Sequence, residues 1–183
     1  MQLVIYMNAA LEMEQEKYPG KKIVPAGLFY YQMKDPMIDK ELDENKRAAK
    51  LLKALRPDGV VNQSEEVLER LEHGMAGQST VLPVARNKDG SLSKTSKTLR
   101  EDEFKTISEF VAKKMKNIGI DILKGEADVS PYEMGDRSGC DYCPYKGVCG
   151  FDEKIPGYEY RKLGKVGKEE ALAKMREEAE TWE

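Results

Sequence analysis

The sequence predicts a mixed α/β (α+β) fold, in which a small mixed sheet is flanked by helices and followed by an irregular, cysteine-rich segment. Segments with apolar residues at helical spacing alternate with short runs that are rich in β-branched and aromatic residues. The chain has 183 residues, of which 40% are hydrophobic, so it is long enough to bury a core. All three cysteines fall within residues 140–149.

The first expected elements are a helix and a strand. Leu3, Met7 and Leu11 lie at helical spacing, which predicts a helix from the first residues to about Tyr18, ended by the Pro-Gly pair that follows. Because the chain opens inside this apolar helix without a capping residue, we expect it to be part of a longer polypeptide. Residues 23–33 carry β-branched and aromatic residues on both faces, which predicts a covered strand.

Two helices are expected next. Charged residues alternate with apolar ones over residues 39–55, which predicts an amphipathic helix closed by a turn at residues 56–59. Asn62 and Glu65 have the spacing of a capping box and predict a shorter helix that ends near Gly74.

A hairpin and a longer helix follow. Residues 79–85 are expected to form a short strand, and a turn over residues 87–90 connects it to a return limb that holds Leu92. Apolar residues at helical spacing then predict a helix that begins at a cap within residues 98–101 and runs to about Ile118.

The C-terminal third is expected to be less regular. Residues 122–131 are predicted as a loop or an edge strand, and after a polar linker residues 168–182 are predicted as a surface helix. We therefore assign residues 1–155, including the cysteine segment 139–152, to one domain. Residues 156–183 would form the linker and the surface helix.

The charge balance limits the classes of function. The chain has 30 basic and 33 acidic residues and a formal net charge of -3, so any contact with nucleic acid must be local. No apolar run approaches the roughly 20 residues that span a bilayer, and the N-terminus lacks the pattern of a secretion signal. We expect a cytoplasmic protein that does not contact a membrane.

The cysteines Cys140, Cys143 and Cys149 follow the pattern C-x2-C-x5-C and favour a metal or cluster site. A tight turn brings the first pair together, and the third thiol returns from the next turn. A disulfide is disfavoured in a reducing compartment. A fourth ligand is needed, and His73 could supply it in a Cys3His zinc site of a non-catalytic interaction module. Three buried, inert thiols are the remaining alternative.

Gln2 and Tyr6 lie four residues apart, so they share one face of the first helix and can point at one ligand. Alone this signal is weak, because a half-buried tyrosine beside an exposed glutamine gives the same spacing. Together with the aromatic strand at residues 26–31 and the late cysteines, the pattern resembles the C-terminal part of the AddB subunit of the AddAB ATP-dependent helicase–nuclease. The resemblance covers Gln2 to about Asp152.

The resemblance implies that this chain is part of a PD-(D/E)xK, restriction-endonuclease-like domain. Gln2 and Tyr6 would form the accessory catalytic QxxxY motif of that family. Cys140, Cys143 and Cys149 would hold a 4Fe-4S cluster that acts as a structural staple, with a fourth cysteine that lies upstream in the family and is absent from this chain.

The family's Mg²⁺ ligands, a catalytic Asp and a D-x-K pair, also precede the region of likeness. We therefore expect no Mg²⁺ ligand in this chain and no DNA cleavage by the chain alone. Asp152-Glu153-Lys154 spells D-x-K but follows the cysteines, and we expect it to be solvated surface.

The function that the resemblance implies is the processing of DNA ends in double-strand break repair and recombination. The intact enzyme would need Mg²⁺, the cluster, DNA and an AddA-like helicase–nuclease subunit, and its helicase parts would use ATP. A Cas4-like iron–sulfur exonuclease is a related alternative, but the long stretch between Tyr6 and Cys140 favours AddB.

A basic stretch at residues 91–100 could contact DNA phosphates through Lys94, Lys97 and Arg100. A solvated hairpin arm that leads into the next helix explains the same residues. The modest number of basic side chains favours this second interpretation.

Overall fold

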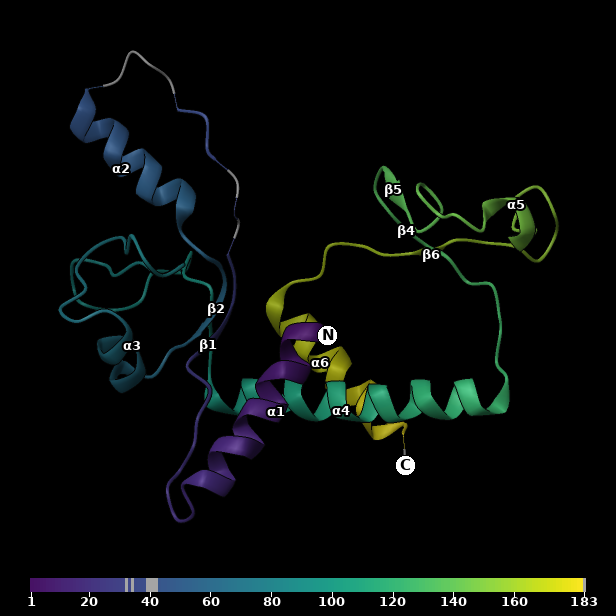
Figure 1. The fold of residues 1–183 in the computed structure, drawn as a ribbon, viewed down its shortest axis with the longest axis horizontal. Coiled ribbons are helices and arrows are strands. Elements are labelled where there is room, and N and C mark those ends of the chain that lie inside the picture. The colour runs from purple at the N-terminus through teal and green to yellow at the C-terminus, as the bar shows by residue number, and fades with distance from the viewer. Residues whose placement is uncertain (32, 34, 39–42, 183) are drawn as a thin grey trace. The chain divides into compact units, whose positions relative to one another are not determined.

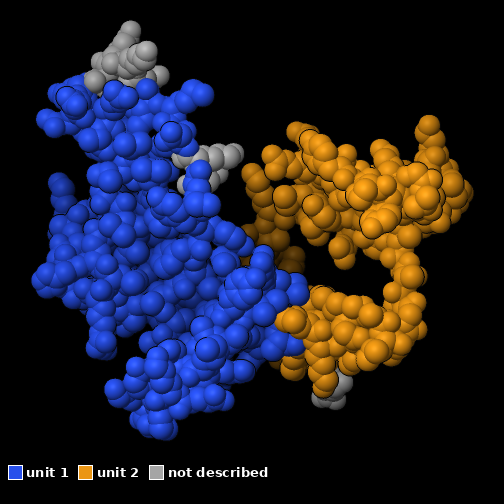
Figure 2. All heavy atoms as spheres, viewed as in Figure 1, with its two compact units in different colours: residues 1–112 blue, residues 113–183 orange. Residues whose placement is uncertain are grey.

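The computed structural model describes residues 1–31, 33, 35–38 and 43–182. The chain forms two compact units, residues 1–112 and residues 113–183 (Figure 2). Each unit is described by itself below. The domain boundary expected from the sequence, after residue 155, is a different kind of division and stays a prediction.

The first unit combines a three-stranded sheet with helices (Figure 1). Its strands, in spatial order, are β1 (Gly27–Tyr30), β2 (Asp58–Asn62) and β3 (Thr98–Leu99). β1 and β2 are antiparallel, with Gly27 opposite Val61, whereas β2 and β3 are parallel, with Val61 opposite Thr98. The small mixed sheet flanked by helices confirms the predicted fold class.

Helices carry most of the remaining residues of this unit. They are α1 (Gln2–Lys17), α2 (Glu44–Leu55), α3 (Glu65–Leu71) and the first half of α4 (Glu101–Lys124). α1 and α4 were predicted at nearly these positions, although α4 continues beyond Ile118. α2 begins after Asp43, whose carboxylate accepts the N–H of Asn45, and the start predicted at residues 39–42 lies outside the described residues.

Apolar packing fixes α1 against α4. Val4 and Met7 of α1 share one buried cluster with Phe104 and Val111 of α4, and Phe104 is only 1% exposed. The apolar spacing that predicted both helices therefore marks the faces that meet. A second buried cluster supports α3 and the segment after it, and it consists of Val61, Leu68, Met75, Leu82 and Val84.

The sequence-based prediction was wrong for residues 56–62, where we expected a turn and a helix start. This segment forms β2, and Gly59 has φ of +152° because its α-carbon lies against the backbone of β1. A Cβ there would come within 1.9 Å of the Leu28 carbonyl oxygen. Asn62, expected to cap a helix, is buried at the strand end, and α3 begins three residues later.

The predicted strand at residues 79–85 is also absent from the structure. The Ser79 hydroxyl accepts the N–H groups of Val81 and Leu82, at 3.0 and 2.6 Å, and this turn replaces an extended backbone. Single bridges join Gln78 to Ala85 and Arg86 to Leu92. The predicted turn at residues 87–90 is confirmed, because the N–H of Gly90 donates to the Asn87 carbonyl at 3.0 Å.

The second unit contains the end of α4, a second small sheet and the last helix (Figure 1). Its elements are β4 (Tyr132–Met134), β5 (Arg137–Ser138), α5 (Lys146–Cys149), β6 (Arg161–Lys162) and α6 (Lys168–Glu180). β4 lies between β5, its antiparallel neighbour, and β6, its parallel neighbour. α6 was predicted at nearly this position. The three short strands were not predicted, and β6 falls where a polar linker was expected.

Helix α6 packs along the end of α4. The Lys114 ammonium pairs with Glu178 at 2.7 Å and lies 4.7 Å from the centroid of the Trp182 ring. Met115, the last residue of the predicted apolar stripe on α4, remains 45% exposed. In the described part of the chain, no helix is both long enough and apolar enough to cross a membrane.

Candidate functional site

Gln2 and Tyr6 meet on the surface of α1, as their spacing predicted. The Gln2 side-chain amide donates a hydrogen bond of 2.9 Å to the Tyr6 hydroxyl, and Tyr6 is 60% exposed. Tyr6 also lines a groove of about 440 Å³ between α1 and residues 23–29. The two polar groups thus act as one hydrogen-bonded pair at the edge of an apolar groove.

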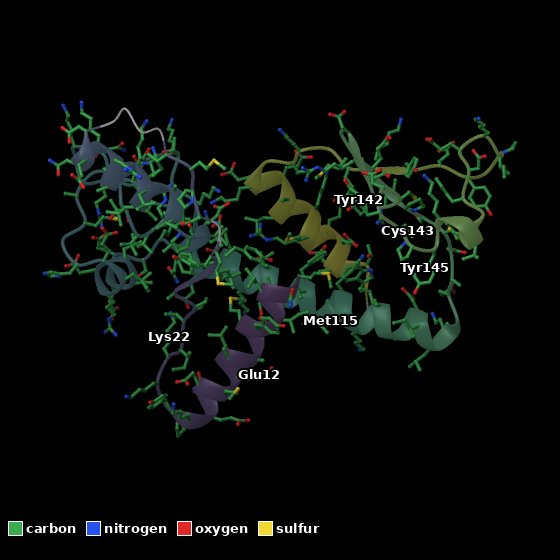
Figure 3. The ribbon with its side chains drawn as sticks, turned by 45° about the horizontal axis from the view of Figure 1, so that its top comes forward. Glu12, Lys22, Met115, Tyr142, Cys143 and Tyr145 are labelled. Atoms are coloured by element: carbon green, nitrogen blue, oxygen red, sulfur yellow. The ribbon has the colours of Figure 1, made fainter. Side chains whose placement is uncertain are left out.

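The cysteines lie on consecutive turns of the second unit, with Cys143 between the exposed side chains of Tyr142 and Tyr145 (Figure 3). The N–H of Cys143 reaches back to the Cys140 carbonyl at 3.4 Å, which forms the tight turn of the C-x2-C pair. Cys149 ends the short helix α5, which is closed by Gly150 in the left-handed region at φ of 70°. All three thiols are unbonded to one another and half-buried.

The cysteines fit an iron–sulfur centre in chemistry but are not assembled into one. Three thiolates are the soft ligands that such clusters use. Across the described residues, however, no three Cys, His, Asp or Glu side chains are grouped so that they could share one metal ion. A metal role for these cysteines therefore stays a prediction.

Cys140 has the most built surroundings of the three cysteines. The Asp141 carboxylate accepts two hydrogen bonds of 2.8 Å from Ser138, one from its backbone N–H and one from its hydroxyl. These bonds, helped by the charges of Lys146 and Arg137, hold the pKa of Asp141 below its usual range. The N–H of Cys140 donates to the same serine hydroxyl oxygen at 3.2 Å, so the backbone of the first cysteine is held by a side chain.

Tyr160 also reaches Cys140, a contact that no sequence pattern indicated. Its phenol hydrogen-bonds with the Cys140 side chain, which raises the pKa of Tyr160, and it also contacts the Ser138 hydroxyl. The signal that could have drawn attention to it is compositional: Phe151, Tyr158 and Tyr160 gather directly after the last cysteine.

His73, the alternative fourth ligand, lies in the first unit just after α3. Its Nδ1 contacts the Glu69 carboxylate, and its side chain is 92% exposed. This exposed ion pair explains the histidine without a metal, although it does not test the zinc alternative.

The predicted DNA-contacting residues are partly engaged within the chain. Lys97 pairs with Asp58 of β2, and Arg100 pairs with Asp102 and with the buried carboxylate of Glu103. Glu103 also accepts the N–H of Arg100 at 2.7 Å, so it caps the start of α4 in place of the predicted cap. Lys94 lies exposed in the turn before β3. A DNA contact by Lys94, Lys97 and Arg100 stays a prediction.

The D-x-K triplet that follows the cysteines is exposed, as expected. The Asp152 carboxylate accepts the N–H of Lys154 at 2.9 Å, which forms a local turn. The triplet is therefore surface rather than a buried carboxylate site.

The helix, the adjoining strand and the polar pair on the helix define a class of protein. A family model described as the PD-(D/E)XK nuclease superfamily matches residues 1–150, and the chain belongs to this superfamily. The relatives narrow the class to AddB, a subunit of the ATP-dependent helicase/deoxyribonuclease. The chain is 34% identical over 98% of its length to the AddB of Lachnoclostridium phytofermentans, and it covers 16% of that relative.

Two further relatives carry the same name. The AddB of Caldanaerobacter subterraneus subsp. tengcongensis is 34% identical over 97% of the chain, and that of Bacillus cereus is 32% identical over 96%. The chain covers 15% of each. The resemblance to AddB is confirmed, and the chain spans about one sixth of the curated relatives that it matches.

Proposed function

We propose that this chain forms the C-terminal part of the nuclease domain of an AddB-type subunit, which processes DNA ends in double-strand break repair and recombination. The observation that carries the proposal is the exposed Gln2–Tyr6 hydrogen bond, in a chain whose relatives are named as deoxyribonuclease subunits. Because those relatives are far longer, residues outside this chain would complete the activity, and the chain alone would not cleave DNA.

Gln2 and Tyr6 would orient groups in the site rather than ionise. The Gln2 amide donates to the Tyr6 oxygen, so the hydroxyl proton of Tyr6 is available to an anionic acceptor. A DNA phosphate oxygen or a catalytic carboxylate would be such an acceptor, and a hydrogen bond to a charged group is stronger than one to a neutral group. Mg²⁺, bound by carboxylates outside this chain, would supply the Lewis-acid chemistry of phosphodiester hydrolysis.

Cys140, Cys143 and Cys149 would provide three ligands of a 4Fe-4S cluster, and a cysteine outside this chain would provide the fourth. Their clustering and their unbonded, half-buried state support this role. Metal analysis separates this proposal from the alternative in which His73 completes a zinc site. Iron and sulfide in the anaerobically purified full-length protein would support the cluster, whereas one equivalent of zinc would contradict it.

The intact protein would act with an AddA-like helicase–nuclease subunit on DNA, in the cytoplasm, and its helicase parts would use ATP. The helicase name of the relatives favours this assignment over a Cas4-like exonuclease.

The test is a nuclease assay on full-length protein that carries Gln2→Ala or Tyr6→Phe. Glu12→Ala, an exposed position on the same helix (Figure 3), is the matched control. Each site variant should slow DNA cleavage about tenfold, which corresponds to about 1.4 kcal/mol of lost orientation in the transition state. ATP-dependent unwinding should not change. Wild-type cleavage by both site variants would refute the role of the pair.

A further inference from the structure

Tyr160 is distant from the cysteine motif in sequence but adjacent to it in the fold. It lies immediately before β6, which pairs in parallel with β4, so that Arg161 stands opposite Tyr132. The N–H of Arg161 donates to the Pro131 carbonyl at 2.9 Å. This pairing returns the chain to the strand that leads into Cys140, and it explains how the Tyr160 phenol reaches the Cys140 side chain.

Aromatic packing holds the Tyr160 ring in this position. Its centroid lies 4.8 Å from that of Phe151 at an interplanar angle of 62°, an edge-to-face contact. Tyr158 packs on the same Phe151 ring at 5.6 Å. Because Phe151 directly follows the glycine that closes α5, the cluster connects the end of the cysteine segment to its beginning.

The distribution of protons around Cys140 identifies Tyr160 as the donor. Ser138 has one hydroxyl proton, and it goes to the Asp141 carboxylate at 2.8 Å. The serine oxygen already accepts the N–H of Cys140 at 3.2 Å. The phenol proton of Tyr160 therefore has the Cys140 sulfur as an acceptor, and a ligating thiolate is a stronger acceptor than a neutral hydroxyl.

We propose that Tyr160 is a positioning residue for Cys140, whose sulfur it holds through a hydrogen bond from its hydroxyl. The role of Cys140 as a cluster ligand rests on the proposed function. In that setting the hydrogen bond has a second effect. A donor to a ligating sulfur stabilises the more electron-rich, reduced state of a cluster, so Tyr160 raises the reduction potential.

The contact itself can be tested in the metal-free chain. Tyr160→Phe removes only the hydroxyl, and Tyr158→Phe is the matched control on the other side of Phe151. Amide hydrogen exchange in residues 137–143 should be about fivefold faster in Tyr160→Phe than in the wild type, because the hydrogen bond that restrains this segment is lost. The control should exchange like the wild type. Equal exchange in all three proteins would overturn the inference.

The second measurement uses the full-length protein, reconstituted anaerobically with iron and sulfide. Tyr160→Phe should shift the reduction potential of the cluster to a more negative value, and Tyr158→Phe should not. A loaded cluster with the same potential in Tyr160→Phe and the wild type would overturn the inference but leave the proposed cluster intact. A wild-type protein that binds no iron–sulfur cluster would refute that cofactor, while the exchange result would still decide whether Tyr160 holds Cys140.

Discussion

Two hydrogen bonds between α1 and α4 should contribute measurably to the position of the helix that carries Gln2 and Tyr6. The Ser108 hydroxyl donates to the Asn8 side-chain oxygen at 2.6 Å. The Asn8 amide donates in return to the Ser108 backbone carbonyl at 3.3 Å. Both bonds are partly buried beside the apolar cluster, so water replaces them poorly when one partner is removed.

The two side chains are not equivalent, which makes the expected energies specific. Ser108→Ala removes only the short bond and should cost about 1–2 kcal/mol, because it leaves the Asn8 oxygen without that donor. Asn8→Ala removes both bonds and should cost about 2 kcal/mol. Once Asn8 is absent, Ser108→Ala has little left to remove. The double variant should therefore resemble Asn8→Ala, with a coupling energy of about 1 kcal/mol.

Urea unfolding followed by circular dichroism measures all four free energies of unfolding in the cycle. Glu12→Ala on the solvent face of α1 is the control and should change the free energy of unfolding by less than about 0.5 kcal/mol. A coupling energy near zero, with the two single changes adding in the double variant, would show that the hydrogen bonds do not link the helices.

Two further predictions concern strand β2. Gly59→Ala should destabilise the chain by about 1–3 kcal/mol in the same unfolding assay, because the new Cβ meets the Leu28 carbonyl and the positive φ disfavours it; an unchanged unfolding midpoint would contradict the β1–β2 register. The hydrogen bond from Lys97 holds the pKa of Asp58 below its ordinary value of 3.8, so this pair stabilises the folded chain above that pH and the contribution is lost on acidification below it. Asp58→Asn should therefore flatten the fall in the free energy of unfolding between about pH 5 and about pH 2, and the same pH profile in both proteins would rule this out.

Features that depend on local spacing were predicted well. The Gln2–Tyr6 pair lies within one helix, so its geometry follows from the helical repeat alone. The apolar stripe that includes Phe104 and Val111 likewise marked the buried face of α4. In both cases the sequence separation that sets the contact is only three or four residues or a multiple of it.

Features that depend on distant pairing could not be predicted in this way. Residues 58–62 contain Asp58 and Gly59, which favour turns, and they form a strand only because β1 and β3 supply partners on both sides. The Tyr160–Cys140 contact has the same origin, since the pairing of β4 with β6 brings Tyr160 back. No periodicity in the sequence encodes either pairing.

The pairing of β4 with β6 closes a loop that contains all three cysteines, and backbone hydrogen bonds are sufficient to close it. The N–H of Leu163 donates to the Glu133 carbonyl at 2.7 Å, beyond the bond between Arg161 and Pro131. Much of the entropy of loop closure, which a metal centre often has to offset on binding, is thus met by the polypeptide before any ligand arrives. On such a scaffold, loss of a cofactor to oxidants or chelators and its later replacement would form a reversible maintenance cycle of a folded protein, rather than a cycle of unfolding and refolding.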